Sequence, residues 1–285
     1  MSAQTATSNM TRAAASDHRA LAALFERLAL SAGRVIMEVF RAGAEVSHKA
    51  DLSPVTEADR AAERIILEGL RAAIPGLPCV AEEECAEGFV PPALGEAFLL
   101  VDPLDGTKEF ISRSADFTVN IALVESGRPL VGAVFAPMSR ILYLGWPGRA
   151  ERVEVSESFD AGARRRISVR DPAVPPVIVA SRSHRTAATD AYILRFRTAE
   201  IVSIGSSLKF CLIAAGEADL YPRFGPTMEW DTAAGDAVLR AAGGLTETVA
   251  GEPLVYGKRR GPGQALDFAN TDFIARGRTR LEPPV

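Results

Sequence analysis

The feature that most constrains the fold is a series of short apolar runs, each bounded by turn residues or followed by a helical pattern. Runs of this length that are rich in Val, Ile, Leu and Phe predict buried strands rather than helices. In the first half of the chain they cover residues 77–81, 98–101, 117–124, 130–135 and 141–144. The third and fourth runs flank a Ser-Gly-Arg-Pro turn at 126–129, which predicts a hairpin.

Helical periodicity surrounds these strands. Two amphipathic helices are predicted before them, one at 17–42 and one that begins after Thr56 as N-cap and stops at Pro75. Later in the chain, strands at 177–180, 200–204 and 218–221 alternate with helices at 186–196, 206–215 and 231–242. This alternation predicts an α/β (α+β) layered sandwich.

A polar segment at 156–176 divides the chain. It carries the run Arg164-Arg165-Arg166 and several prolines, a composition typical of an exposed loop between lobes. We therefore expect an N-terminal α+β lobe at 17–155 and a C-terminal α/β lobe at 156–285, which together form one functional unit. Residues 1–16 are small and polar, and we expect them to form a disordered tail.

The composition limits the partners. The chain has 285 residues, 47% of them hydrophobic, which is enough for a substantial core. Its net charge of −4 predicts no surface for long nucleic acid, whereas a small phosphorylated ligand needs only a local positive pocket. Three cysteines without zinc-like spacing favour a reducing cytoplasm, and no uncharged apolar run reaches the ~18–20 residues of a transmembrane segment. The oligomeric state and peripheral association with the inner membrane stay open.

Acidic residues follow the ends of predicted elements at four places: Asp59, the Glu82-Glu83-Glu84 run, Asp102 with Asp105, and Asp231. The densest string is Asp102-Pro103-Leu104-Asp105-Gly106-Thr107, where an apolar strand ends, Pro103 prevents it from continuing in a central ladder, and a helix can begin. Such a turn can aim two carboxylates into one cavity beside unpaired backbone N–H groups. Carboxylates bind Mg²⁺ together with water and phosphate oxygens, and a helix start binds phosphate. The string therefore indicates metal-assisted phosphoryl hydrolysis.

Each acidic string also has a purely structural explanation. Asp102 and Asp105 could cap a helix and fill a turn, as such strings commonly do. The glutamate run could be a solvated loop, and Asp231 could be an N-cap. Other chemistries fit the chain poorly, because it has neither a P-loop nor a Gly-x-Ser-x-Gly string and its histidines lack metal-ligand spacing.

Three strings together resemble the signatures of the inositol monophosphatase superfamily. They are Glu82-Glu83, Asp102-Pro103-Leu104-Asp105-Gly106-Thr107 and Trp230-Asp231-Thr232-Ala233-Ala234-Gly235, in the order that this superfamily has. Ala81 departs from the pattern, because a serine commonly precedes the glutamate pair. The resemblance extends from about residue 20 to the C-terminus and implies an inositol-monophosphatase-like fold of two lobes with the active site in the cleft between them.

Further strings resemble the CysQ-type 3′(2′),5′-bisphosphate nucleotidases of this superfamily. They are the stretch from Lys49 to Asp59, Lys108-Glu109-Phe110, Gly205-Ser206-Ser207-Leu208-Lys209-Phe210-Cys211 and Tyr221-Pro222-Arg223. Inositol phosphatases usually have an asparagine before the phenylalanine of the second string, where this chain has Glu109.

The resemblance implies a set of ligands for two or three Mg²⁺ ions. Glu82, Asp102 and the carbonyl of Leu104 would bind the first ion, and Asp102, Asp105 and Asp231 the second. Glu82, Thr107 and Asp59 are implied as catalytic residues, with the last two hydrogen-bonding the attacking water and accepting its proton.

The resemblance also implies a substrate side. Gly106, Thr107 and Lys108 would face the phosphate together with Glu82, Asp105 and Asp231. His184 would contact the nucleoside, and Lys209 and Arg223 the second phosphate or the base. The alternatives are a surface-loop histidine for His184 and a solvated side chain for Lys209.

The implied activity is Mg²⁺-dependent removal of the 3′-phosphate of adenosine 3′,5′-bisphosphate, giving AMP, with the sulfated relative of this nucleotide as a further substrate. That activity would serve sulfur metabolism and would be sensitive to lithium. Two alternatives stay open: an inositol-phosphate or sugar-phosphate phosphatase, and a non-catalytic sensor of nucleotide or metal.

Overall fold

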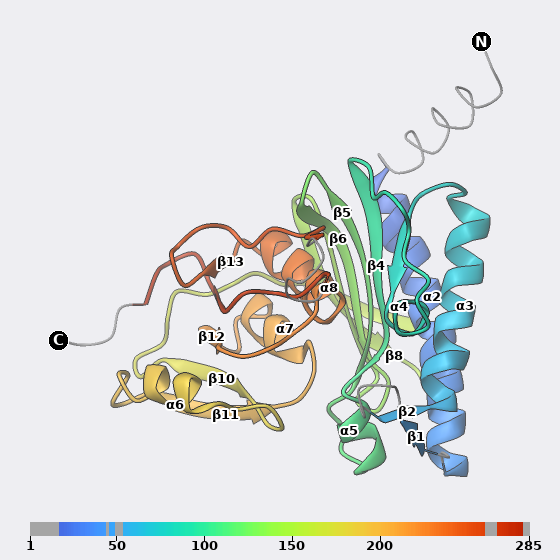
Figure 1. Ribbon diagram of the computed structural model, residues 1–285. Helices are drawn as coiled ribbons and strands as arrows, with labels where there is room; N and C mark the ends of the chain where they lie inside the picture. The colour runs from blue at the N-terminus through green and yellow to red at the C-terminus, as the bar shows by residue number, and fades with distance from the viewer. Residues whose placement is uncertain (1–16, 44–45, 49–53, 260–266, 282–285) are drawn as a thin grey trace.

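Two large β-sheets and the helices packed on them form a layered α/β molecule (Figure 1). The computed structural model describes residues 17–43, 46–48, 54–259 and 267–281. The predicted tail at 1–16 and positions 49–53 of the N-terminal motif lie outside the described residues. The α/β fold class predicted from the sequence is confirmed, because the order of layers is helix, sheet, helix, sheet, helix.

The first sheet has seven strands in the order β3-β4-β5-β6-β7-β8-β9. The first pair is parallel and all later pairs are antiparallel. The strands are β3 (Cys79–Ala81), β4 (Ala97–Asp105), β5 (Thr118–Glu125), β6 (Arg128–Ala136), β7 (Ile141–Trp146), β8 (Arg149–Val155) and β9 (Ala161–Arg166). The predicted hairpin is formed by β5 and β6 around Ser126 and Gly127, which both have positive φ.

The strand β4 is longer than predicted. The sequence placed its end at residue 101 because of Pro103, but β4 continues to Asp105. Its pairing with β5 shifts register between Asp102 and Asp105, so Pro103 lies in a bulge, where a missing N–H costs no ladder bond. The bulge re-aims the chain just before the predicted acidic site.

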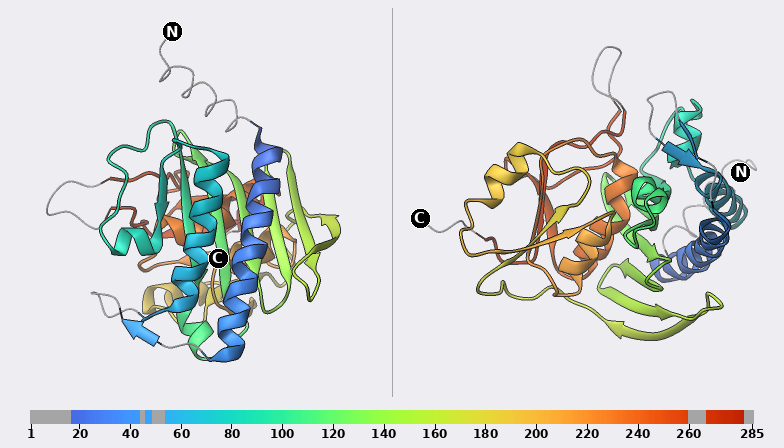
Figure 2. Two further views of the ribbon diagram at one scale, coloured as in Figure 1. Left: turned by 90° about the vertical axis from the view of Figure 1, so that its right-hand side faces the viewer. Right: turned by 90° about the horizontal axis from the view of Figure 1, so that it is seen from below.

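Two long helices cover one face of this sheet and run side by side across it (Figure 2). They are α2 (His18–Ala42) and α3 (Glu57–Ala73), and both match the predicted helices. Their apolar faces pack against alternate residues of the strands, such as Val119, Ile121 and Leu123 of β5. A short two-stranded sheet, β1 (Val46–His48) and β2 (Pro54–Thr56), precedes α3.

The second sheet has five strands in the order β11-β10-β12-β14-β13. They are β10 (Val177–Ser181), β11 (Glu200–Ile204), β12 (Leu220–Arg223), β13 (Leu245–Thr248) and β14 (Phe273–Arg276). The last two were not predicted, since neither is a distinct apolar run. The helices of this half are α6 (Ala187–Ile193), α7 (Leu208–Ala214) and α8 (Glu229–Ala241), close to the predicted ranges.

The helices α7 and α8 lie between the two sheets, and α6 lies on the outer side of the second sheet (Figure 1). The helix α8 approaches the first sheet closely at two glycines. A Cβ at Gly132 would lie 2.3 Å from the carbonyl of Ala234, and one at Gly145 would lie 2.6 Å from Cα of Val238. The same helix also packs against β4, the strand that carries the bulge.

The expectation for the segment 156–176 was wrong in part. Arg164, Arg165 and Arg166 form the exposed edge strand β9 of the first sheet instead of a loop. Arg164 pairs with Glu26 and Arg165 with Glu217. A division into two lobes would therefore fall after residue 166 rather than at 155, and the division itself stays a proposal. No helix in the described part of the chain is long and apolar enough to cross a membrane.

Candidate active site

The β4 bulge leads directly into a tight turn and a short helix. Gly106 has φ 95° and ψ 42°, the left-handed conformation that glycine adopts without strain, and it is the N-cap of α5 (Thr107–Ile111). Asp102 is buried, and its Oδ1 accepts a hydrogen bond from the N–H of Leu104 at 3.0 Å. The structural role considered for Asp102 is thus real, and it also fixes the direction of the turn.

Asp59 lies behind this turn in the first turn of α3. It completes a capping box, because its Oδ2 accepts from both the N–H and the hydroxyl of Thr56 at 2.7 Å. Its Oδ1 is 3.2 Å from the Thr107 hydroxyl, which is also 3.3 Å from the carbonyl of Leu104. The Asp59–Thr107 pair predicted from the sequence is therefore in contact.

The glutamate run forms a helix rather than a solvated loop. Glu82 begins α4 (Glu82–Ala86), directly after β3. The buried carboxylate of Glu63 in α3 accepts the N–H groups of Glu83 at 2.8 Å and Glu84 at 2.9 Å. Burial raises the pKa of Glu63 to about 7, against the lowering effect of these two hydrogen bonds. The sequence analysis did not single out Glu63.

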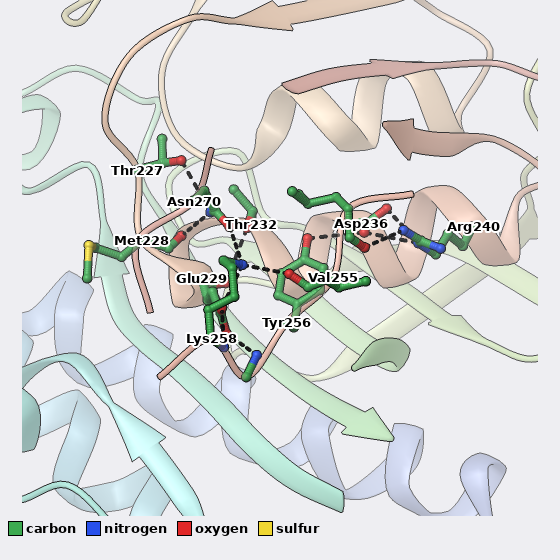
Figure 3. Close-up of polar contacts among 12 residues, drawn as sticks. Thr227, Met228, Glu229, Thr232, Asp236, Arg240, Val255, Tyr256, Lys258 and Asn270 are labelled. Atoms are coloured by element: carbon green, nitrogen blue, oxygen red, sulfur yellow. Dashed lines mark hydrogen bonds and ion pairs between the residues drawn. The ribbon is translucent and has the colours of Figure 1, made fainter. Parts of the chain in front are cut away.

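Asp231 lies in the first turn of α8, where its Oδ2 accepts the N–H of Met228 at 2.8 Å. This turn is held by a buried polar network (Figure 3). The amide of Asn270 lies within hydrogen-bond distance of three groups: the Thr227 hydroxyl (3.2 Å), the Met228 carbonyl (2.8 Å) and the Thr232 hydroxyl (3.0 Å). On the same turn, Glu229 accepts the N–H groups of Gly257 and Lys258. These hydrogen bonds fix the first turn of α8, which carries Asp231.

One cavity of about 260 Å³ collects most of the predicted site. Nine of the twelve predicted residues line it: Glu82, Asp105, Gly106, Thr107, Lys108, His184, Lys209, Arg223 and Asp231. The remaining three, Asp59, Asp102 and Leu104, are buried immediately behind the cavity wall. The cavity lies between the two halves of the chain, since β4 and α5 contribute lining residues from the first half and β12 and α8 from the second.

Three carboxylates, those of Glu82, Asp105 and Asp231, form the acidic side of the cavity. Holding all three of them charged so close together is electrostatically unfavourable. Burial raises the pKa of Asp231 well above its usual value, and the carboxylates of Asp105 and Glu82 raise it further. Burial also raises the pKa of Asp105, whereas Lys209 and hydrogen bonds from Ser207 lower it. A divalent cation would relieve this repulsion.

The donor set fits Mg²⁺. Within the described residues, no three His, Cys, Asp or Glu side chains are arranged to hold an ion by themselves. Mg²⁺ does not require such a cage, because it keeps several waters and binds through one or two carboxylates plus substrate phosphate oxygens. Hard carboxylate oxygens and a backbone carbonyl, with no thiol and no imidazole on the acidic side, are the chemistry that this ion prefers.

The same cavity is also lined by basic groups, Lys108, His184, Lys209 and Arg223, which form its basic side. Nζ of Lys108 is 3.1 Å from Nε2 of His184. His184 lies exposed in a loop at the cavity, as the surface-loop alternative had it. Partial burial of its ring lowers its pKa, and the nearby charges of Lys108 and Arg223 lower it further, so the imidazole is neutral near pH 7 and can accept this bond. Burial lowers the pKa of Lys209 to about 8, although Asp105 opposes that shift.

Lys209 and Arg223 are buried rather than solvated. Nζ of Lys209 lies 5.2 Å from the centre of the Tyr221 ring and donates to the carbonyl of Ser206. Arg223 donates to the carbonyls of His184 at 2.9 Å and Pro226 at 2.7 Å, and its Nε has no partner among the described residues. The alternative of a solvated Lys209 is therefore wrong.

The family model described as the inositol monophosphatase family matches residues 17–279. The chain therefore belongs to the inositol monophosphatase family.

The similar proteins narrow this class. The chain is 47% identical to the 3′(2′),5′-bisphosphate nucleotidase CysQ of Escherichia coli strain K12 over 235 residues, which is 82% of this chain and 92% of that protein. It is 41% identical over 251 residues to the protein of the same name from Buchnera aphidicola, covering 87% of this chain and 91% of that one.

Solved structures agree with these relatives. The crystal structure of CysQ from Bacteroides thetaiotaomicron has a TM-score of 0.74 and 36% identity, and the match covers 92% of this chain and 98% of that chain. An inositol monophosphatase from Anabaena (Nostoc) has a TM-score of 0.68 and 25% identity, with 91% and 92% covered. The resemblance predicted from the sequence motifs is confirmed.

Proposed function

We propose that this chain is a metal-dependent phosphatase that removes the 3′-phosphate of adenosine 3′,5′-bisphosphate, giving AMP and phosphate. One observation carries the proposal: the acidic side, with Glu82, Asp105 and Asp231, and the basic side share a single small cavity. The acidic side suits a divalent cation, and the basic side suits a second negative group on the same substrate. The nucleotidase relatives at 47% identity support this substrate class.

The residues that would hold Mg²⁺, as two or three ions, are Glu82, Asp102, Asp105, Asp231 and the carbonyl of Leu104. When bound, Mg²⁺ supplies positive charge that acidifies the attacking water and balances charge on the phosphate and on the leaving oxygen. The chain's own contribution is to hold four carboxylates and a carbonyl at the junction of β3, β4 and α8.

The proton of the attacking water would pass to Thr107 and Asp59. The Thr107 hydroxyl lines the cavity and is 3.2 Å from Oδ1 of Asp59. It can accept a proton from the water while it donates its own to the carboxylate. Oδ2 of Asp59 already accepts two hydrogen bonds from Thr56, which orient Oδ1 toward Thr107.

The other groups would position the substrate. Gly106, Thr107 and Lys108, at the start of α5, would face the reacting phosphate. Lys209, Arg223 and His184, on the basic side of the cavity, would contact the second phosphate and the nucleoside. Charge on that side contributes binding energy without taking part in bond cleavage.

A side-by-side assay tests the proposal. Phosphate release is measured from adenosine 3′,5′-bisphosphate, its sulfated relative, inositol 1-phosphate and fructose 1,6-bisphosphate, with Mg²⁺ and with excess chelator. We expect Mg²⁺-dependent release that is fastest from the adenosine nucleotide. Faster release from inositol 1-phosphate would favour the inositol phosphatase alternative, and binding without release would favour the sensor. A titration with LiCl against KCl at matched ionic strength tests the expected lithium sensitivity.

A cytoplasmic location is part of the same proposal. Cys79, Cys85 and Cys211 are free thiols, which supports a reducing compartment. Peripheral association with the inner membrane and the oligomeric state are separate questions, to be answered by vesicle sedimentation and by light scattering.

A further inference from the structure

A buried pair of polar side chains connects the two aspartates on the acidic side. Nδ2 of Asn120 is 3.0 Å from Oγ of Ser207 and 3.5 Å from Oδ2 of Asp105. Oγ of Ser207 in turn is 3.0 Å from Oδ2 of Asp105 and 2.5 Å from the backbone carbonyl of Asp231. The pair therefore connects the end of β4 to the first turn of α8.

The elements that carry this pair come from both halves of the chain. Asn120 is in β5, directly opposite Asp102 in the antiparallel ladder. Ser207 is the N-cap residue of α7, beside the second sheet. Neither residue was given a role by the sequence motifs, although Ser207 lies within one of them.

The hydroxyl of Ser207 does not cap its own helix. An N-cap serine commonly accepts an N–H of its own helix, but Ser207 makes no such capping bond. Its hydroxyl instead accepts from Asn120 and has its hydrogen available for the oxygens of Asp105 and Asp231. The geometry thus directs this hydroxyl toward the acidic site.

Asn120 is an energetically unfavourable residue in the interior of a sheet. It is 1% exposed, its strand neighbours Val119 and Ile121 are fully buried, and its Oδ1 has no hydrogen-bond partner among the described residues. A buried amide with an unpaired oxygen destabilises the fold relative to an apolar side chain of similar size. The benefit of Asn120 must therefore come from its Nδ2, which faces Ser207 and Asp105.

We propose that Asn120 and Ser207 are positioning residues that hold the Asp105 carboxylate and the Asp231 turn at the spacing a divalent cation requires. This inference rests on the proposed metal-dependent function. Mutating partners that orient metal ligands in this way typically lowers metal affinity or activity by about 10- to 100-fold.

The test compares Asn120→Leu and Ser207→Ala with the parent protein. Mg²⁺ binding is measured by titration calorimetry without substrate, and phosphate release is measured across a Mg²⁺ series. We expect the Mg²⁺ affinity of both variants to fall by about 10- to 100-fold, with activity partly recovered at high Mg²⁺. The melting temperature in the presence of chelator separates a role in metal positioning from a role in stabilising the fold. Without metal, Asn120→Leu should melt at the same temperature as the parent or higher.

A matched control is Thr246→Val. The Thr246 hydroxyl is buried and donates to Asp236 of the same helix α8 at 2.7 Å, but neither residue lines the cavity. This variant should lose stability and keep the Mg²⁺ affinity of the parent. If the parent binds Mg²⁺ and both site variants bind it equally well, the positioning role is wrong. If the parent itself neither binds Mg²⁺ nor releases phosphate, the proposed function fails, and the positioning role fails with it.

Discussion

The charge of Asp105 is the property on which the proposed reaction depends most directly. Asp105→Asn keeps the shape of the side chain but removes a charge that holds Mg²⁺. We expect phosphate release to be nearly abolished while the melting temperature stays at or above that of the parent, because burying this charge is unfavourable. Asp160→Asn, at an exposed loop position, is the control. Activity within about tenfold of the parent at saturating Mg²⁺, or 1.4 kcal/mol of barrier, contradicts this role.

Lys209 should distinguish a bisphosphate from a monophosphate. Lys209→Met keeps the apolar stem beside Tyr221 and removes the buried charge. We expect kcat/KM for adenosine 3′,5′-bisphosphate to fall by about 10- to 100-fold, the value of a hydrogen bond to a charged group. The loss for adenosine 3′-monophosphate should be much smaller, because it lacks the remote phosphate. Equal losses on the two substrates would remove Lys209 from the second-phosphate site.

A site residue could be predicted from the sequence when it belongs to a recognisable local motif. The cavity-lining positions of Asp105, Asp231 and Lys209 were predicted because each belongs to a motif. Glu63 and Asn120 were missed, because one lies on a helix face and the other in an apolar strand. Only the fold brings them to α4 and Ser207, which are distant in the sequence.

At the scale of elements, α4 depends on a carboxylate from another helix. Glu63→Gln removes a group whose pKa is about 7 in the folded protein and 4.5 unfolded. The folded state binds this proton more tightly, so the contribution of Glu63 to stability is full below pH 4.5 and is lost as the pH rises through 7. The difference in unfolding free energy, parent minus variant, should fall by roughly 2 to 3 kcal/mol between pH 5 and pH 8.

Urea unfolding at the two pH values measures this difference. Asp219→Asn is the control, because this carboxylate is also buried and accepts a backbone N–H, from Val177, but its pKa is lowered by Arg170. Asp219→Asn should therefore not show the Glu63 pattern. A parent-minus-variant difference for Glu63→Gln that stays constant between pH 5 and pH 8 would contradict the expectation.

Elements with strong local signals were predicted well, and elements that depend on neighbours were not. The helices α2 and α3 follow from apolar periodicity and caps. The strand β9 was predicted as a loop because its residues are exposed and charged, and it exists only because β8 pairs with it. The extension of β4 past Pro103 also depends on its partner, since the bulge accommodates the proline.

At the scale of the whole molecule, the convergence of the acidic strings could be predicted only through the family resemblance. Glu82 and Asp231 are far apart in the chain, and no periodicity places α8 against the first sheet. The contact depends on glycines of β6 and β7 that admit the helix backbone, a feature visible only after the strands are paired. Family motifs therefore named residues that the fold brings to one cavity, whereas local patterns did not predict the contact between α8 and the first sheet.

The two halves of the molecule are also joined beside the cavity by Asp116. Its Oδ2 accepts from Arg182 at 2.7 Å and from the N–H of Gly205 at 3.0 Å. Arg182 and Gly205 follow β10 and β11, which are parallel, so one aspartate of the first half holds the ends of two strands of the second. This contact should keep the basic side of the cavity at a constant distance from the acidic side.

Asp116→Ala should therefore weaken nucleotide binding without changing Mg²⁺ affinity. Arg182 is half-exposed, so its ion pair with Asp116 contributes little free energy, and most of the contribution comes from the hydrogen bond to the N–H of Gly205. The loss of that bond predicts a rise in KM of roughly fivefold, or about 1 kcal/mol. Glu217→Ala is the matched control, because Glu217 pairs with Arg165 and also joins the two halves, but neither residue lines the cavity. Steady-state kinetics give KM, and calorimetry gives the Mg²⁺ affinity.

Equal changes in KM for the two variants would show that the position of the contact beside the cavity is irrelevant. A fall in Mg²⁺ affinity for Asp116→Ala would show that the contact supports the acidic side instead.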